Sequence, residues 1–125
     1  MKKKIGIIIV AYNHEHFLEK LLERIPSEII KKVAEIAVFD DHSSDKTFDI
    51  GIKYKEKKKL EKLSIFYNEK NLGYGGNQKK GYRYFIDNGF DIVILLHGDG
   101  QYPPELLPQF LVPLEKEEAD AVFGS

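Results

Sequence analysis

The chain has 125 residues, of which 42% are hydrophobic and 31% are charged, so it can form one hydrophobic core and is not a disordered segment. Its formal net charge of −1 excludes a general electrostatic attraction to nucleic acid. It has no cysteine, which excludes disulfide bonds, thiolate metal sites and cysteine nucleophiles. A basic start and a short apolar run without a cleavage site predict a first strand instead of a signal peptide, and we expect a cytoplasmic domain.

Apolar runs and helical periodicities alternate in the first half of the chain. Residues 5–11 are apolar and predict a strand that is buried on both faces. Asn13 is expected to cap the helix that follows, and a second strand is expected at 36–39 after a short turn. Either Ser44 or Asp45 can cap the next helix, whose lysine- and glutamate-rich end is typical of a solvated surface.

The same alternation continues in the second half. A third strand is expected at 63–67, then a turn-rich loop at 68–76 and a helix that ends at Asn88-Gly89. Residues 92–96 predict another buried strand, and a proline-interrupted helix leads to a last strand at the end of the chain. Strands that alternate with helices predict an α/β fold, with a mainly parallel sheet and helices on both faces.

Polar residues follow three of the predicted strands, and they meet at the edge of a parallel sheet where ligands of open α/β folds bind. They are Tyr12-Asn13, Asp40-Asp41-His42-Ser43-Ser44-Asp45 and His97-Gly98-Asp99. Asp99 comes just after an apolar strand, and the glycines on either side of it allow a sharp turn and the close approach of a ligand. This carboxylate therefore stands where a ligand is expected.

Two common nucleotide sites are absent from the sequence. A dinucleotide site needs Gly-x-Gly-x-x-Gly after the first strand, where this chain has Ala-Tyr-Asn-His-Glu-His. The glycine-rich segment 73–76 lacks the Gly-Lys-Ser/Thr ending of a phosphate-binding P-loop. Its backbone N–H groups can still face an anion at a helix N-terminus, so we expect Gly75 and Gly76 to contact a nucleotide.

Four motifs, in this order and at this spacing, resemble the family 2 glycosyltransferases, which are enzymes of GT-A fold that use nucleotide-activated sugars. They are Ile9-Val10-Ala11-Tyr12-Asn13, Asp40-Asp41-His42-Ser43-Ser44-Asp45-Lys46-Thr47, Asn71-Leu72-Gly73-Tyr74-Gly75-Gly76 and Asp99-Gly100-Gln101-Tyr102-Pro103-Pro104-Glu105. The resemblance extends from Ile5 to Ser125. It implies a Rossmann-like GT-A fold and a single nucleotide-sugar-binding domain over residues 1–125.

The resemblance implies a nucleoside subsite at the first two loops. Ala11 and Tyr12 would line the nucleobase, with Tyr12 able to stack on it. Asp40 and Asp41 would contact base and ribose, and Asp41 is the favoured of the two. Structural interpretations stand beside these: Tyr12 can pack over the sheet edge, and the two acids can be turn and capping residues.

The resemblance also implies a metal site. The family's Asp-x-Asp motif binds a divalent cation that bridges the diphosphate, and here it is His97-Gly98-Asp99. Mn²⁺ or Mg²⁺ held by Asp99 would neutralise the departing diphosphate, and Gly98 and Asp99 would contact diphosphate and sugar. His97 replaces the first acid, and it can be a metal ligand that suits Mn²⁺, a phosphate contact or a purely positional residue.

Part of a transferase site is expected outside the chain. In inverting family members a carboxylate base deprotonates the acceptor, and the resemblance places that base in a second half of the domain, beyond Ser125. We therefore expect a truncated fold without the acceptor-binding half, whose uncovered sheet edge favours a homo-oligomer. A donor-binding half of a glycosyltransferase and a non-catalytic binding or assembly module both fit this interpretation. The sequence does not distinguish between polyprenyl phosphate, a glycan and a protein as the acceptor. Membrane association is expected only through a longer parent chain.

Overall fold

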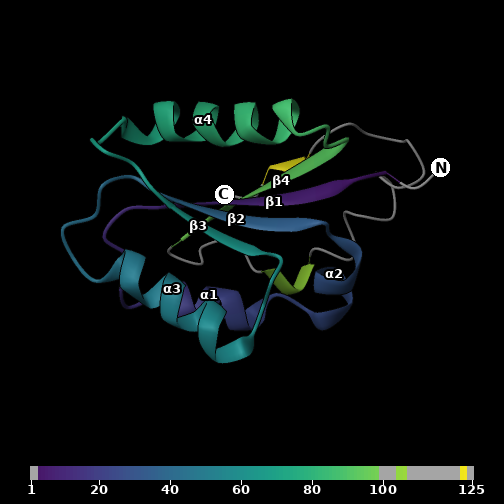
Figure 1. Cartoon of the computed structure of the whole chain (residues 1–125), viewed down its shortest axis with the longest axis horizontal. Helices are drawn as coiled ribbons and strands as arrows, with labels where there is room; N and C mark the ends of the chain where they lie inside the picture. The colour runs from purple at the N-terminus through teal and green to yellow at the C-terminus, as the bar shows by residue number, and fades with distance from the viewer. Residues whose placement is uncertain (1–2, 99–103, 107–121, 124–125) are drawn as a thin grey trace.

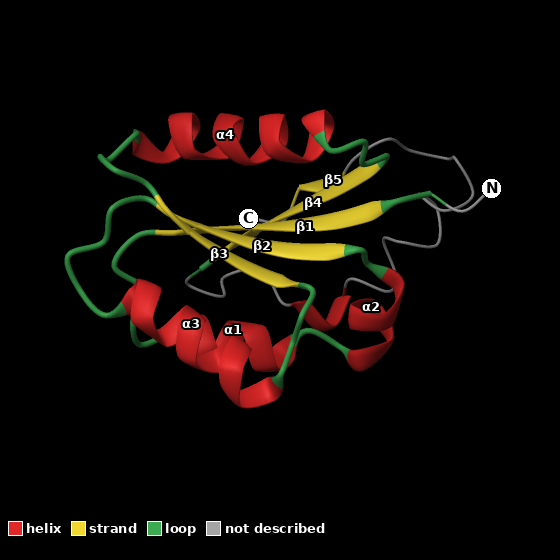
Figure 2. Ribbon diagram, viewed as in Figure 1, coloured by secondary structure: helices red, strands yellow, loops and turns green. Residues whose placement is uncertain are grey.

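The computed structural model describes residues 3–98, 104–106 and 122–123, which form a parallel sheet between two layers of helices (Figures 1 and 2). Within these residues the strand order is β3-β2-β1-β4-β5, and every neighbouring pair is parallel. The strands are β1 (Ile5–Ala11), β2 (Glu35–Asp40), β3 (Leu63–Tyr67), β4 (Ile92–His97) and β5 (Val122–Phe123). The predicted α/β class and parallel sheet are confirmed.

Helices cover both faces of the sheet, as the alternating pattern predicts. Among the residues that the structure describes, α4 lies on one face, and α1, α2 and α3 lie on the opposite face (Figure 1). The helices are α1 (Leu18–Arg24), α2 (Ser27–Lys32), α3 (Thr47–Lys58) and α4 (Gly73–Asp87), and a short 3₁₀ turn, η1, covers Pro104–Leu106. Among the described residues, no helix combines the length and hydrophobicity that a membrane crossing requires.

The central strand β1 is buried along its whole length because it packs against both helical layers. Ile7 and Ile9 face the core beneath α1 and α3, and Ile8 and Val10 face the core beneath α4. Gly81 lets α4 lie close to the sheet, since a Cβ there would be only 3.0 Å from Cγ2 of Ile8. This packing fixes the N-terminal end of α4 above the carboxyl ends of the strands (Figure 2).

Two local predictions were wrong at the start of helices. Asn13 does not cap a helix, because α1 begins only at Leu18 and Asn13 has a left-handed backbone with φ 53°. Asparagine tolerates that conformation, and its side chain bonds to the neighbouring loop instead. The expected short turn before β2 is the helix α2, which buries Ile29.

The glycine-rich segment 73–76 was predicted as a loop, but it forms the first turn of α4. Gly73 begins the helix with φ 81°, a conformation that suits glycine. Asn77, Gly81 and Phe85 recur every four residues and are buried against the sheet, so packing outweighs the low helix propensity of glycine. The helix stop at Asn88-Gly89 is confirmed, and Gly89 has φ 76°.

Candidate functional site

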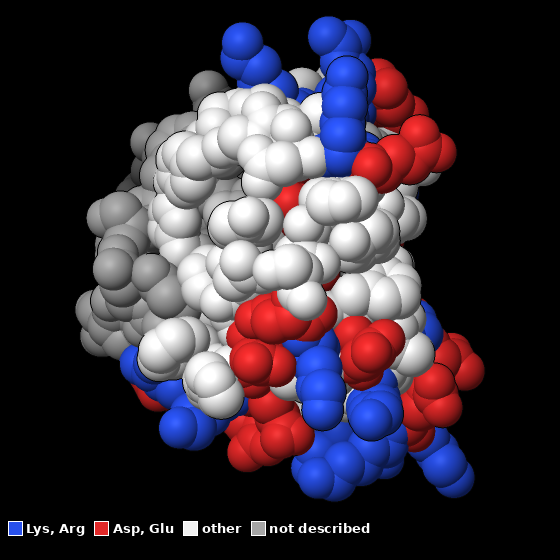
Figure 3. All heavy atoms as spheres, turned by 90° about the vertical axis from the view of Figure 1, so that its left-hand side faces the viewer, with Lys and Arg blue, Asp and Glu red and all other residues white. Residues whose placement is uncertain are grey.

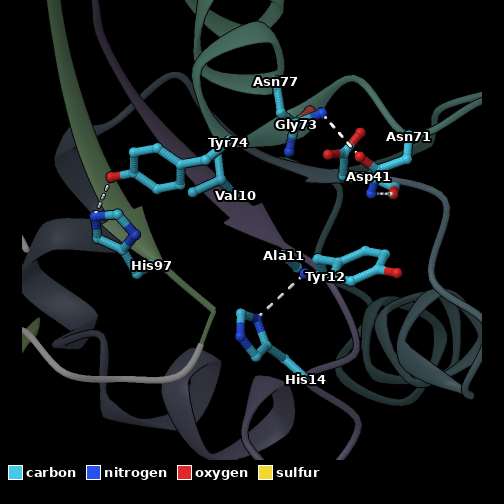
Figure 4. A pocket seen from close by; sticks show the side chains of 10 residues that line it. All are labelled: Val10, Ala11, Tyr12, His14, Asp41, Asn71, Gly73, Tyr74, Asn77 and His97. Atoms are coloured by element: carbon cyan, nitrogen blue, oxygen red, sulfur yellow. Dashed lines mark hydrogen bonds between the residues drawn. The ribbon is translucent and has the colours of Figure 1, made fainter.

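A cavity of about 360 Å³ opens at the carboxyl ends of β1 and β4, beside the start of α4 (Figure 4). This is the switch point of the sheet, because the chain continues from β1 to β2 on one side and reaches β4 on the other. Ten residues line it: Val10, Ala11, Tyr12, His14, Asp41, Asn71, Gly73, Tyr74, Asn77 and His97. The middle of this edge of the molecule is largely uncharged, with acidic and basic side chains gathered around it (Figure 3).

The loop after β1 is bonded to the loop after β2. The backbone N–H of Asn13 donates to Oγ of Ser43 at 2.8 Å, and Oδ1 of Asn13 accepts from the N–H of Ser44 at 2.9 Å. The N–H of His14 donates to Oγ1 of Thr47 at 2.8 Å. These bonds hold the two loops together below the cavity.

Asp45 strengthens the same junction just before α3, whose N-cap residue is Lys46 and not the predicted Ser44 or Asp45. One carboxylate oxygen accepts from the N–H of Thr47 at 2.9 Å, and the other accepts from the N–H of Glu15 at 3.2 Å. Burial acts to raise the pKa of Asp45, but the hydrogen bonds from Thr47 and Glu15 outweigh it and hold that pKa below its usual value. Asp45 is therefore a charged structural residue at the start of α3.

The two adjacent acids at the end of β2 have different surroundings. Asp40 is 0% exposed and does not line the cavity. Its Oδ1 accepts from the N–H of Ser43 at 2.9 Å and from the Ser43 hydroxyl, while its Oδ2 lacks a hydrogen-bond partner in the described part of the chain. Burial raises the pKa of Asp40. This position gives no support to the predicted nucleotide contact through Asp40, because the carboxyl group faces the loop's own backbone.

Asp41 lines the cavity and ties β2 to the segment before α4. Its Oδ1 accepts from the N–H of Leu72 at 2.7 Å and from Nδ2 of Asn68 at 3.0 Å. Its backbone carbonyl accepts from Nδ2 of Asn71 at 3.1 Å. The acid that the sequence favoured is thus the one that reaches the cavity, and its orientation is fixed by two donors.

Two buried asparagines that the sequence analysis did not single out support Asp41. Nδ2 of Asn68 also donates to Oδ1 of Asn77 at 2.9 Å, and Nδ2 of Asn77 donates to the carbonyl of Phe39 at 2.9 Å. Lys80 completes the network by donating to Oδ1 of Asn68 at 2.7 Å. The only sequence signal for this network is the recurrence of asparagine around the glycine-rich segment.

Tyr74 and His97 form the opposite side of the cavity from Asp41 (Figure 4). The Tyr74 hydroxyl is hydrogen-bonded to Nε2 of His97 at 2.8 Å. Their rings are stacked, with centroids 5.1 Å apart. Tyr74, which is 57% exposed, was not predicted as a site residue. The pair joins the start of α4 to the end of β4.

The remaining predicted site residues fall into three groups. Ala11 and Tyr12 line the cavity, and Tyr12 is 47% exposed at its rim. Gly75 and Gly76 lie in the first turn of α4 and are not among the lining residues. Gly98 is buried, and its N–H donates to the carbonyl of Val10 at 2.8 Å.

The predicted metal ligand Asp99 lies outside the described residues. Within the described ranges no group of three or more histidines and acids is arranged to hold a metal ion. His97 is in the cavity wall and precedes Asp99 by two residues in the sequence.

The fold and the site define a parallel α/β domain with a cavity at the switch point of its sheet, and comparison with known proteins identifies the family. The family model for Glycosyl transferase family 2 matches residues 6–125, so the chain belongs to this family. The predicted family is therefore confirmed.

Two curated relatives illustrate the match. An uncharacterized protein of Methanocaldococcus jannaschii is 34% identical over 94% of this chain and 49% of its own length. A dolichol-phosphate mannosyltransferase of Pyrococcus furiosus is 31% identical over 98% of this chain and 33% of its own length. The chain thus spans between a third and a half of these relatives.

Solved structures share the fold. A mannosyltransferase from Pyrobaculum calidifontis, in complex with GDP-Man and Mn²⁺, superposes with a TM-score of 0.72 at 20% identity, over 90% of this chain and 32% of that one. A glucosyl-3-phosphoglycerate synthase from Mycobacterium tuberculosis, in complex with Mn²⁺, UDP and phosphoglyceric acid, superposes with a TM-score of 0.67 at 21% identity. The match covers 90% of this chain and 39% of that one. The expected GT-A fold is confirmed.

Proposed function

We propose that the chain binds a nucleotide-diphospho-sugar donor, as the donor-binding part of a glycosyltransferase that transfers the sugar to an acceptor hydroxyl or phosphate. The observation that carries the proposal is the cavity at the switch point, with Asp41 and Tyr12 on one side and His97 on the other. Its position is where ligands of open α/β sheets bind. Family membership over residues 6–125 supports the same function.

The two sides of the cavity suit the two ends of a nucleotide. The exposed ring of Tyr12 offers a flat apolar surface for a base, and the Asp41 carboxylate offers an acceptor for base or ribose donors. In this proposal the diphosphate lies at the end of β4, where Asp99 follows the buried Gly98 in the sequence. Gly75 and Gly76 lie in the N-terminal turn of α4, and in this proposal they contribute to nucleotide binding through the backbone N–H groups of that turn.

The proposal includes a divalent cation held by Asp99, after the end of β4 in the sequence. The carboxylate of Asp99 is a ligand that suits Mn²⁺ or Mg²⁺. Because Nε2 of His97 is bonded to Tyr74, we assign the metal to Asp99 and make His97 a wall residue beside the diphosphate. When bound, the cation supplies positive charge that offsets the charge of the departing diphosphate.

The acceptor side of the reaction is proposed to lie in a further part of the protein. The relatives are longer than the matched segment, and an inverting transfer needs a general base near the acceptor hydroxyl. The Pyrococcus relative is named for dolichol phosphate, and other relatives are named for undecaprenyl phosphate. A polyprenyl phosphate is therefore the acceptor that we favour over a glycan or a protein.

A thermal-shift panel tests the donor site. Melting temperature is measured with UDP, GDP, UDP-glucose and GDP-mannose, each with and without Mn²⁺. We expect at least one nucleotide to raise the melting temperature, more so with Mn²⁺, and Asp99→Ala to abolish the Mn²⁺-dependent part. Asp87→Ala, an exposed acid at the far end of α4, is the matched control and keeps the shift. The absence of a shift with every nucleotide would contradict the proposal.

A further inference from the structure

His14, in the loop after β1, contacts the start of α3 and Gly98 at the end of β4, although no sequence motif marks it. We infer that His14 is a positioning residue that couples the loop after β1 to Gly98 at the end of β4. The inference rests on the proposed function in one respect: it takes these two segments as the nucleoside and diphosphate ends of the donor site.

The backbone and side chain of His14 are both anchored. Its N–H donates to Oγ1 of Thr47 at 2.8 Å, which fixes it to the start of α3. Nδ1 of its ring accepts from the N–H of Tyr12 at 3.3 Å. The ring also meets the edge of Phe17, with centroids 6.4 Å apart and an interplanar angle of 80°. The imidazole therefore has a defined place under Tyr12.

The imidazole lies directly against the backbone of Gly98. A Cβ at position 98 would be 2.6 Å from Nδ1 of His14, 3.1 Å from Cβ of Ala11 and 3.2 Å from the carbonyl of Val10. The ring thus fills the space that a side chain at 98 would need. Since the N–H of Gly98 is also bonded to Val10, the turn is held from both sides.

This contact joins two segments that have different tasks in the proposed site. Tyr12 is at the rim where a base would stack, and Gly98 directly precedes Asp99. A displacement of about 1 Å at a group that positions a ligand can cost up to about 100-fold in rate. If His14 holds Gly98 in place, its loss shifts the end of β4 and loosens the Tyr12 backbone together.

Two substitutions at position 14 separate the ring's roles. His14→Asn keeps an oxygen close to the position of Nδ1, so the Tyr12 N–H retains an acceptor while the ring's bulk against Gly98 is lost. His14→Ala removes both. His16→Ala is the matched control, because His16 is on the same loop and its side chain is 84% exposed.

Binding of UDP or GDP with Mn²⁺, measured by calorimetry, is the first readout. We expect His14→Ala to raise Kd by about 10-fold, the upper end for one lost hydrogen bond, with partial rescue in His14→Asn. His16→Ala leaves Kd unchanged. Equal affinities in wild type, His14→Ala and His16→Ala would overturn the inference.

A double-mutant cycle with Gly98→Ala tests the contact itself. Gly98→Ala alone weakens binding, because the new methyl group collides with the imidazole. In the double variant His14→Ala, Gly98→Ala the closest collision is gone, so Gly98→Ala costs less there than in wild type, and only the contacts with Cβ of Ala11 and the carbonyl of Val10 remain. Fully additive losses would show that the two residues act separately and would overturn the inference.

A readout without ligand separates failure of the inference from failure of the proposed function. In amide NMR spectra we expect His14→Ala to shift the Gly98 signal and to speed hydrogen exchange at Tyr12, whereas His16→Ala changes neither. If wild-type protein binds no nucleotide but these amides respond, the proposed function fails and the coupling stands. An unchanged Gly98 signal in folded His14→Ala protein overturns the coupling, whatever the wild type binds.

Discussion

The Tyr74 hydroxyl lies 2.8 Å from Nε2 of His97, and the planes of the two rings differ by only 3°. Tyr74 is in the first turn of α4 and His97 ends β4, so this contact closes one wall of the cavity. His97 stands where the motif of the resembled family has an acid. No carboxylate stands at this position, which removes a negative charge from the place where a diphosphate is proposed to bind.

The first prediction separates the two parts of this contact. Tyr74→Phe keeps the stacked ring and removes the hydrogen bond to His97, so we expect nucleotide affinity to fall about 2- to 10-fold. Tyr74→Ala removes the ring as well and gives a larger loss. Calorimetric titration with UDP or GDP and Mn²⁺ measures both. Tyr84→Phe is the control, because its hydroxyl bonds to Glu35 instead of a cavity residue. Unchanged nucleotide affinity in Tyr74→Ala would contradict the assignment of Tyr74 and His97 to the wall of the nucleotide site.

The second prediction distinguishes the adjacent acids. Asp41→Asn removes the charge that faces the cavity and places an amide near the donors of Leu72 and Asn68. We expect it to weaken nucleotide binding by about 1.5–3 kcal/mol, the range for hydrogen bonds to charged groups. Asp40→Asn, one residue earlier, leaves nucleotide binding unchanged because Asp40 is buried outside the cavity. A greater loss in Asp40→Asn than in Asp41→Asn would reverse this assignment.

The third prediction concerns pH. Burial raises the pKa of Asp40 above the usual 3.8, so the folded state holds this proton more tightly than the unfolded state. The contribution of Asp40 to the free energy of unfolding is therefore fully present below pH 3.8 and is lost as the pH rises through the raised pKa. Relative to wild type, Asp40→Asn gains stability over that interval, and the difference then levels off.

Urea unfolding of wild type and Asp40→Asn across the acidic to neutral range tests the pH prediction. The Asn side chain keeps an oxygen for the Ser43 N–H, so the comparison isolates the ionisation of Asp40. A stability difference that does not vary with pH would show that Asp40 titrates with the same pKa in the folded and unfolded states.

Much of the fold could be predicted because its signals are local. The strands β1 and β4 are nearly continuous apolar runs. Such a run is enough to predict a strand that is buried on both faces. The predicted start of α4 was wrong, because segment 73–76 contains three glycines and such a segment favours a loop. The segment is helical because Asn77 and Gly81 in the next turns pack on the sheet. The prediction that Asn13 caps a helix was wrong for a similar reason, since its hydrogen-bond partners are in a loop about 30 residues further along the chain.

The site was predicted in part, by residue type more than by role. Asp41 and Tyr12 could be placed at the cavity because polar residues after parallel strands meet at one edge. Asp41 was favoured over Asp40 only through the family resemblance. The two residues themselves could not be separated, because which of two successive side chains faces the cavity depends on where the strand ends. The contacts of His14 and Tyr74 depend on side-chain geometry between distant elements.

The last prediction uses two glycines with opposite surroundings. Gly6 in β1 leaves no room for a side chain, since a Cβ there would be 2.9 Å from Cδ2 of Phe90 and closer still to the ring of Phe85. Gly6→Ala should destabilise the fold by about 1–3 kcal/mol through overpacking. Gly75 is in α4 with no neighbouring atom within 4 Å of an added Cβ. Gly75→Ala should therefore stabilise by about 0.5–1 kcal/mol, because alanine loses less backbone entropy in a helix. Urea unfolding measures both, and a destabilised Gly75→Ala would show that this turn of α4 is not helical in solution.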